Sequence, residues 1–240
     1  MLLWYTFIMN YTNIKEAVFL ERPNRFIAHC LLKGQPVVAH VPNTGRCKEL
    51  LIPGSTVYLQ EHDSAARKTK YTLITVSHNG SYINIDSQAA NKVVYDYLLE
   101  GNLLPNMEEP IVQLKRECLF GKSRFDLRFD CQGNIGFAEI KSVTLCEDGY
   151  AVFPDAPTER GVKHVYELIE ATKGGYPSYL IFLIQLHDAK GLKPNWKTHP
   201  QFGEALIAAK LAGVQLVAYS CIVSPERLSL DQQVPIILTR

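Results

Sequence analysis

Two amphipathic segments joined by a tight turn, within residues 124–145, constrain the fold of this chain more than any other feature. In the first segment Phe125, Leu127 and Phe129 alternate with charged residues, which is the period of two of a half-buried strand. The second segment alternates in the same way, and Gln132-Gly133 between them is a turn signal. The two segments are therefore predicted to form a β-hairpin with one apolar face and one charged face.

The register of this hairpin brings two carboxylates together. A turn centred on Gln132-Gly133 places Asp126 opposite Glu139, and such cross-strand neighbours have Cβ atoms about 4.5–5.5 Å apart. Carboxylates this close repel each other unless a cation lies between them. Mg²⁺ binds one or two carboxylates together with phosphate oxygens. Because Lys141 shares the face of Glu139, the pattern predicts metal-assisted phosphodiester chemistry.

The same residues also fit an ordinary amphipathic hairpin with a solvated charged face, because the motif is short and uses common residue types. The apolar neighbours of the acids argue against this alternative. Phe137 and Val143 flank Glu139 and Lys141 on one face, so that face is expected to be partly buried. A buried charge is costly without a partner.

Composition places the chain among globular proteins of one or two domains, with 240 residues of which 47% are hydrophobic and 20% charged. The net charge of +1 gives no overall basic signal for nucleic acid. Residues 1–85 nevertheless hold nine Lys/Arg against five Asp/Glu, so the N-terminal third is the more plausible anion-binding half. The six cysteines form no C-x-x-C pair, which argues against zinc and indicates reduced thiols in a cytoplasmic protein.

The apolar start, residues 1–11, is not typical of a targeting or membrane segment. It has neither a basic n-region nor a small-residue cleavage site. It is also far shorter than the ~20 residues of a membrane span. We therefore expect a strand or a loose terminus here and no membrane partner, with Met9 as an alternative start.

Residues 14–85 are predicted to be all β, because short β-rich runs alternate with turn signals such as Asn79-Gly80. The predicted strands are Ala17–Leu20, Phe26–Leu32, Val37–His40, Thr56–Gln60, Tyr71–Val76 and Tyr82–Ile85. This many short strands favour a small closed barrel of the OB type, and OB barrels commonly bind single strands through basic and aromatic residues. The candidates for such a surface are Arg22, Arg25, Phe26, Arg46, Lys48, Arg67, Lys68, Lys70 and Tyr71. The charges among them fit an ordinary solvated barrel surface equally well.

The remainder is predicted to be mixed α/β, with a domain boundary near Asp86 that divides the chain into residues 1–86 and 87–240. A helix over Ser87–Gly101 with Ser87 as its cap opens this part. The further predicted elements are a strand over Ile111–Phe120, the hairpin, a helix from Thr158 to Thr172 ended by Gly174-Gly175, a strand over Tyr179–Leu186, a helix over Phe202–Leu211 and a strand over Val214–Val223.

Two segments give the chain a specific resemblance. They are Glu139–Leu145 (EIKSVTL) and Phe153–His164 (FPDAPTERGVKH). With Arg22–Phe26 and Pro42–Gly45 in the first half, they resemble the sugar fermentation stimulation protein (SfsA) family. The resemblance implies an N-terminal OB-like β-barrel followed by a PD-(D/E)xK nuclease-like mixed α/β domain. It also implies DNA binding with little sequence preference, in a family whose name records a sugar-fermentation phenotype.

The resemblance also implies a set of site residues. Asp126 and Glu139 become the expected metal ligands, with the Ile140 carbonyl as a third. Lys141 would orient the attacking water or stabilise the developing charge, and Ser123 would hold the adjacent phosphate with Arg124. The residues expected to bind DNA are Arg22, Arg25, Arg46, Arg67, Lys68, Arg124, Arg160, Lys163 and His164. The last three fall at i, i+3 and i+4, hence on one helical face that is predicted to point at the hairpin.

Two functions of different classes follow from these features. The first is a DNA nuclease that uses Mg²⁺ or Mn²⁺ at Asp126, Glu139 and Lys141. The second is a DNA-binding regulatory protein whose nuclease-like domain is inactive. A sugar or nucleotide enzyme is disfavoured because the sequence has no Gly-rich phosphate loop. The sequence leaves the oligomeric state open, a homodimer included.

Overall fold

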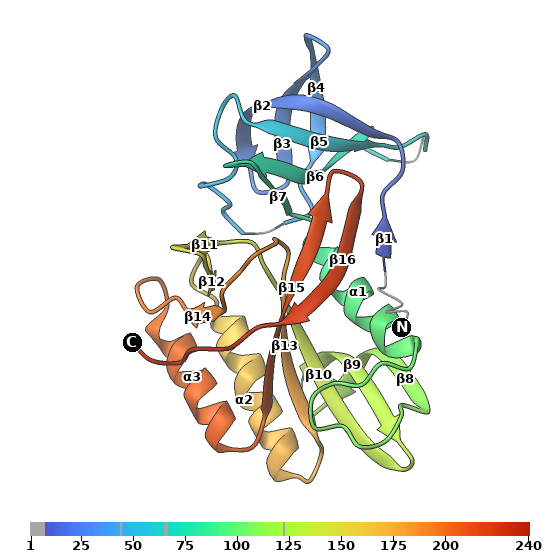
Figure 1. Ribbon diagram of the computed structural model, residues 1–240, viewed down its shortest axis with the longest axis vertical. Coiled ribbons are helices and arrows are strands. Elements are labelled where there is room, and N and C mark those ends of the chain that lie inside the picture. The colour runs from blue at the N-terminus through green and yellow to red at the C-terminus, as the bar shows by residue number, and fades with distance from the viewer. Residues whose placement is uncertain (1–7, 44, 65–66, 122) are drawn as a thin grey trace.

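The computed structural model describes residues 8–43, 45–64, 67–121 and 123–240. Figure 1 shows a barrel, at the top, above a larger α/β part whose central sheet carries helices on both faces. The predicted apolar start lies outside the described residues up to residue 7. In the described part of the chain, no helix is both long enough and apolar enough to cross a membrane.

The upper part is a closed barrel of five strands. Its strands are β2 (Ile14–Asn24), β3 (Ile27–Leu32), β4 (Gln35–His40), β5 (Thr56–Glu61) and β6 (Tyr71–His78), and β7 (Ser81–Asn84) extends it beyond β6. They pair in the cyclic order β2-β3-β4-β6-β5, and the ring closes through a short parallel pairing of Ala39 with Tyr71. Closure removes the free sheet edges that an open sheet of this size would expose.

The lower part is built on a seven-stranded sheet. Its order is β1 (Ile8–Asn10), β16 (Arg227–Gln233), β15 (Gln215–Ser224), β13 (Ser178–Ile184), β10 (Asn134–Val143), β9 (Ser123–Cys131) and β8 (Gln113–Phe120). The strands β10, β13 and β15 are parallel, and every residue of β13 is buried, as expected of a strand covered on both faces. A second sheet of three short strands joins β11 (Cys146–Glu147), β12 (Tyr150–Phe153) and β14 (Leu192–Pro194).

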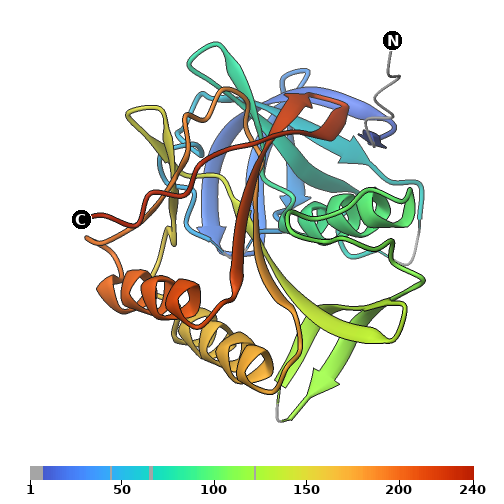
Figure 2. The same cartoon turned by 60° about the horizontal axis from the view of Figure 1, so that its bottom comes forward.

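Three helices of the described chain cover this sheet. The helix α1 (Ser87–Leu99) lies on one face, and α2 (Glu159–Lys173) and α3 (Pro200–Leu211) lie on the other (Figure 2). Thr158 caps α2 as predicted, since its side chain accepts the N–H of Gly161, and Gly175 follows the helix end at φ +87°. The predicted cap of α1 was wrong: the side chain of Asp86 accepts the N–H of Gln88, and Ser87 instead donates its hydroxyl to a main-chain carbonyl of the barrel.

The predicted hairpin register is confirmed over its turn-proximal half. β9 and β10 pair from Cys131–Asn134 to Leu127–Ala138, and the turn residues Gln132 and Gly133 both have positive φ. Beyond Leu127–Ala138 the backbone ladder between these strands ends.

Three parts of the architecture were not predicted. The strand β16 and the three-stranded sheet were missed, because their segments are short or carry several polar residues. β1 pairs with β16, so residues 8–10 belong to the lower sheet although the predicted barrel domain included them.

The two parts share buried contacts. Buried residues of the barrel, such as Val57 and Leu73, belong to the same hydrophobic cluster as Leu180 and Phe182 of the lower sheet. At the junction, Gln185 is fully buried and donates to the Asn84 side chain at 2.6 Å and to the main-chain carbonyl of Asp86 at 2.9 Å. The barrel and the lower part are thereby held in one relative position.

Candidate active site between barrel and sheet

A cleft of about 1280 Å³ lies between the barrel and the α/β part. Its barrel wall includes Arg22, Arg25, Asn43, Arg46 and Lys48, and its α/β wall includes Asp126, Glu139, Ile140, Lys141, Asp155, Arg160 and His164. The predicted acids and several predicted cations therefore face one space, although they are far apart in the sequence.

Asp126 lies where the sheet divides. Backbone pairing between β9 and β10 ends at Leu127–Ala138, and beyond it the Asp126 side chain makes the next hydrogen bond between the two strands. Its Oδ2 accepts the N–H of Ile140 at 2.8 Å, and its Oδ1 accepts the Nδ2 of Asn91, on α1, at 2.8 Å. Each oxygen then keeps acceptor capacity for a further ligand.

Glu139 is held by a hydrogen-bond network of side chains from β10 and α2. Its Oε1 accepts a hydrogen bond from Lys141 Nζ at 2.6 Å and another from His164 Nδ1. The Nε2 of His164 accepts a hydrogen bond from Arg160 Nε at 3.3 Å. Because Nε2 is an acceptor, we assign the ring proton to Nδ1, which donates it toward Glu139.

The two carboxyl groups differ electrostatically. Burial raises the pKa of Asp126, and the nearby negative charge of Glu139 raises it further. Burial alone would also raise the pKa of Glu139, but the hydrogen bond from His164 and the positive charge of Lys141 outweigh it, so that this pKa lies below its usual range. Glu139 is thus the more readily ionised acid of the pair.

One oxygen of the acid pair lacks a partner in the described structure. Glu139 is only 3% exposed, and its Oε2 has no hydrogen-bond donor in the described structure. A buried carboxylate oxygen without a partner is costly, and a hard cation would satisfy it while screening Asp126. The donor set therefore fits a divalent ion bound by oxygen.

Side chains alone do not complete such a site. Within the described ranges, no group of three or more His, Cys, Asp and Glu residues is placed to hold a metal ion. The remaining ligands of an ion at Asp126 and Glu139 would be main-chain, water or phosphate oxygens, as Mg²⁺ accepts. The Ile140 carbonyl stays a prediction, since only the N–H of this residue has an observed partner in the site.

The predicted DNA-binding residues divide into two groups. Arg22, Arg25, Arg46, Arg160 and His164 line the cleft, and Arg67, Lys68, Arg124 and Lys163 do not. Arg67 and Lys68 lie on the loop between β5 and β6, where Arg67 donates to Thr72 at 3.0 Å.

Arg124, Lys163 and Ser123 have protein partners outside the cleft. Arg124 is paired with Glu117 at 3.1 Å on the exposed edge of the sheet. Lys163 turns to Glu167 at 3.6 Å, and Ser123 donates its hydroxyl to that same carboxylate. Of the three predicted residues on α2, only Arg160 and His164 line the cleft. The carboxylate of Glu167 connects Lys163 with Ser123 on β9.

Arg22 and His164 have several partners within the protein, and their predicted phosphate contacts stay predictions. The Nη atoms of Arg22 donate to four main-chain carbonyls, those of Arg25, Asn43, Gly45 and Arg46, so this side chain fixes two loops of the barrel. His164 is buried, with both ring nitrogens engaged by Glu139 and Arg160.

The sequence reasoning missed Asn91 and assigned no role to Asp155. Asn91 orients Asp126 from a helix 35 residues away in sequence, and no local signal marks that pairing. Asp155 accepts the main-chain N–H of Arg46 at 2.7 Å and so joins the two walls of the cleft. A Cβ at Gly45, beside Arg46, would overlap the Asp155 carboxylate and the Asn43 side chain, so a larger residue there would displace this contact. The FPDAP segment carried a signal for Asp155 through its density of polar and proline residues.

The fold and the site together define a class: an OB barrel followed by a restriction-endonuclease-like α/β domain. Residues 20–85 match the family model described as the SfsA N-terminal OB domain, and residues 88–227 match the sugar fermentation stimulation protein RE domain. The chain belongs to the sugar fermentation stimulation protein (SfsA) family.

Individual relatives agree along nearly the whole chain. A sugar fermentation stimulation protein homolog of Clostridium beijerinckii is 46% identical over 96% of this chain and 100% of its own length. One from Desulfitobacterium hafniense (strain Y51) is 49% identical over 92% of this chain and 94% of its own. The solved structure of Pyrococcus furiosus SfsA in complex with Ca²⁺ superimposes with a TM-score of 0.85 at 31% identity, over 95% of this chain and 98% of that chain.

Proposed function

We propose that this protein is a divalent-metal-dependent nuclease that cleaves DNA phosphodiester bonds in the cleft, with Mg²⁺ or Mn²⁺ as its cofactor. The observation that carries the proposal is the buried, unpartnered Oε2 of Glu139 near the Asp126 carboxylate. The restriction-endonuclease-like domain supports it, as does the Ca²⁺ complex of the Pyrococcus furiosus relative. Ca²⁺ and Mg²⁺ are both hard cations that bind oxygen.

Each residue of the site has a separate role in this proposal. Asp126 and Glu139 would hold the metal, with the Ile140 carbonyl as a third protein ligand. When bound, such a metal lowers the pKa of water and stabilises negative charge on a phosphate. Lys141, beside Glu139, presents a positive charge where negative charge develops on the phosphate.

The first test combines cleavage with metal binding. Wild-type protein with Mg²⁺ or Mn²⁺ is expected to shorten end-labelled DNA, and Glu139→Gln is expected to lose both the cleavage and the calorimetric signal of Mn²⁺ binding. Gln keeps the shape of the side chain but removes the charge that a cation requires. Mn²⁺ binding that is unchanged in Glu139→Gln would exclude this acid as a ligand.

Lys141→Ala separates chemistry from binding. We expect the cleavage rate to fall by roughly 10²–10³, as losing one preorganised electrostatic donor typically does. Mn²⁺ affinity should change by only a few-fold, because removing the positive charge of Lys141 favours a nearby cation and offsets the loss of one of the two hydrogen bonds on Glu139 Oε1. Cleavage at the full rate in this variant would exclude the role given to Lys141. If wild-type protein binds DNA but never cleaves it with either metal, the protein is instead a non-catalytic DNA-binding factor.

A further inference from the structure

We propose that the cleft admits DNA as a single strand, which enters at the β2–β3 turn of the barrel. In this arrangement one base stacks on Phe26, and the phosphates follow Arg25, Arg46 and Lys48 toward the acids. The proposal rests on the proposed nuclease function for what happens at the acids. The entry path rests on separate observations.

The main observation behind this entry path is the exposed aromatic ring of Phe26. Phe26 forms the two-residue turn between β2 and β3 together with Arg25, and the residue is 51% exposed. The guanidinium of Arg25 lies 5.9 Å from the centre of its ring. An exposed aromatic ring beside a cation is the pattern that stacks a base and contacts its phosphate.

The turn is rigid although its side chains are exposed. The N–H of Phe26 donates to Asn24 Oδ1 at 2.9 Å, and its carbonyl accepts the N–H of Val41 at 2.8 Å. Arg22 donates to the carbonyl of Arg25 at 2.7 Å. A preorganised surface loses little conformational entropy when it binds a strand.

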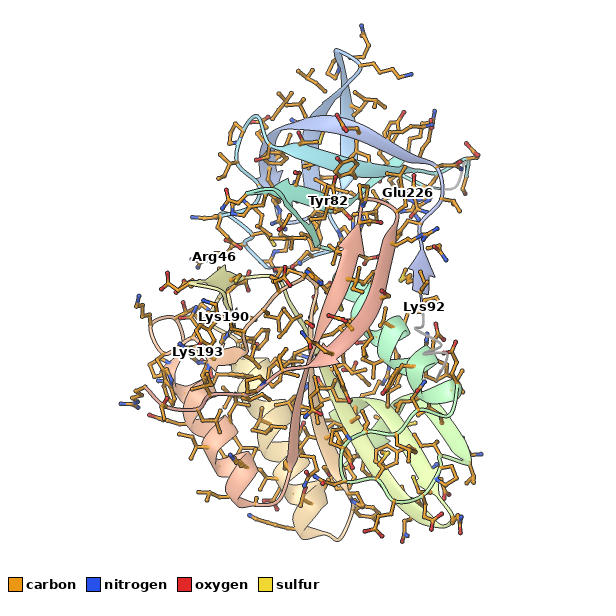
Figure 3. All side chains as sticks on the ribbon, viewed as in Figure 1. Arg46, Tyr82, Lys92, Lys190, Lys193 and Glu226 are labelled. Atoms are coloured by element: carbon orange, nitrogen blue, oxygen red, sulfur yellow. The ribbon has the colours of Figure 1, made fainter. Side chains whose placement is uncertain are left out.

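The turn lies at the cleft. Asn24 and Arg25 belong to the cleft lining, which then continues along the barrel wall to Arg46 and Lys48. Figure 3 shows Arg46 at the level where the barrel meets the lower part. Within the described residues, the side chains of Arg25, Arg46 and Lys48 form no ion pair, so these three cations are available to phosphates.

The shape of the cleft favours one strand over two. Its volume of about 1280 Å³ is only slightly above the ~300–1,000 Å³ of pockets for drug-sized ligands, so it holds a few nucleotides. Glu139 is buried, and the contact of Arg46 with Asp155 joins the two walls. A duplex is a stiff rod and cannot bend into such a site without separation of the walls, whereas a single strand is flexible.

The test measures binding without cleavage. Glu139→Gln protein in EDTA is titrated into a fluorescein-labelled single-stranded 12-mer, and the anisotropy is compared with that of the same 12-mer as a blunt duplex. We expect the single strand to bind at least 10-fold more tightly. Equal affinity, or tighter binding of the duplex, overturns the proposal whether or not the wild type cleaves DNA.

Variants of the turn locate the entry. Phe26→Ala in the same background should weaken single-strand binding roughly 5- to 150-fold, the effect of losing one stacked base, and Phe26→Trp should retain it and show fluorescence quenching on binding. Arg25→Ala should lower the salt slope by about 0.7, the share of one phosphate contact on a single strand. Lys33→Ala, in the exposed β3–β4 turn outside the cleft lining, is the matched control and should leave the slope unchanged. Wild-type affinity and slope in both Phe26→Ala and Arg25→Ala would overturn the entry path.

These results are separable from a failure of the proposed function. A protein that prefers single strands through Phe26 but cleaves none contradicts the nuclease and leaves the path in place. A protein that cleaves DNA but binds duplex and single strand alike contradicts the path and leaves the nuclease in place.

Discussion

At the scale of single residues, the site is organised by partners that keep each carboxylate in one orientation. Both Asp126 oxygens accept one hydrogen bond each, whereas Glu139 receives both of its hydrogen bonds on Oε1. The consequence is that Oε2 of Glu139 is buried without a hydrogen-bond partner in the described structure. Partners of this kind fix the direction of a ligand without touching the metal.

His164 gives the first prediction at this scale. His164→Ala removes one of the two donors on Glu139 Oε1 and leaves Lys141 as the other, so the carboxylate gains rotational freedom. Loss of such a supporting hydrogen bond typically costs about 10–100-fold in metal affinity. We therefore expect Mn²⁺ affinity, measured by calorimetry at neutral pH, to fall within that range.

Two further variants test whether this is positioning. His164→Gln retains a donor and should recover part of the affinity. His29→Ala removes a histidine from an exposed pair with Glu21, away from the acids, and should change nothing. If His164→Ala binds Mn²⁺ as the wild type does, His164 does not position Glu139.

At the scale of elements, helix α1 links the barrel to the acid site. Its cap, Asp86, accepts the N–H of Gln88 and the hydroxyl of Tyr11, and its body carries Asn91 to Asp126. Burial raises the pKa of Asp86, and these two hydrogen bonds with the charge of nearby His40 offset it only in part. Ionised Asp86 is therefore a net cost to the folded state.

The predicted pH dependence follows from the sign of this shift. The pKa of Asp86 is higher in the folded than in the unfolded state. The destabilisation caused by its ionised carboxylate is therefore fully present above the folded-state pKa and disappears below the unfolded-state pKa. Asn caps helices as well as Asp, so Asp86→Asn removes the charge and keeps the cap. We expect the free energy of unfolding of Asp86→Asn, relative to wild type, to be higher at pH 7 than near pH 4, close to the ordinary Asp pKa of about 3.9.

Urea unfolding at both pH values measures this difference. Asp86→Ala is the comparison, because it removes the cap as well and should forfeit about 1 kcal/mol at both pH values relative to Asp86→Asn. An Asp86→Asn variant whose gain is the same at both pH values would show that the buried charge is not the cause.

The elements that could be predicted from the sequence are those in which the spacing of apolar residues reflects which side of the element is buried. The hairpin, α2 and the buried strand β13 each have an unbroken apolar pattern, so their positions and the pairing near Gln132-Gly133 followed from residues alone. β16 was missed because Arg227, Asp231 and two glutamines interrupt its pattern, and its pairing with β15 and β1 stabilises it. The nearness of Asp126 and Glu139 followed from the same local pattern, whereas Asn91 and Asp155 act through contacts between distant elements.

At the scale of the whole molecule, the barrel and the lower sheet share one core, and this determines how the cleft behaves. The hydrophobic cluster runs through both parts, and Gln185 is fully buried at their junction. Its Nε2 donates to the Asn84 side chain and to the Asp86 carbonyl, and its Oε1 accepts the Ser142 hydroxyl. Ser142 itself lines the cleft, so this network connects the junction with the wall that carries Glu139.

We predict that the protein unfolds as a single cooperative unit and that Gln185→Ala destabilises both parts together. The substitution removes the three hydrogen bonds of a buried side chain, at a cost of about 0.5–1.5 kcal/mol each, although Asn84 Oδ1 and the Asp86 carbonyl each keep one other donor. Hydrogen exchange in low concentrations of urea measures the two parts separately. Slow amides of β5 in the barrel and of β13 in the sheet should lose protection by the same free energy.

Gln232→Ala, an exposed glutamine of β16, is the control and should stay within about 0.5 kcal/mol of wild type. If β5 loses protection while β13 keeps it, the barrel is an independent unit, and the walls of the cleft are free to separate around a duplex.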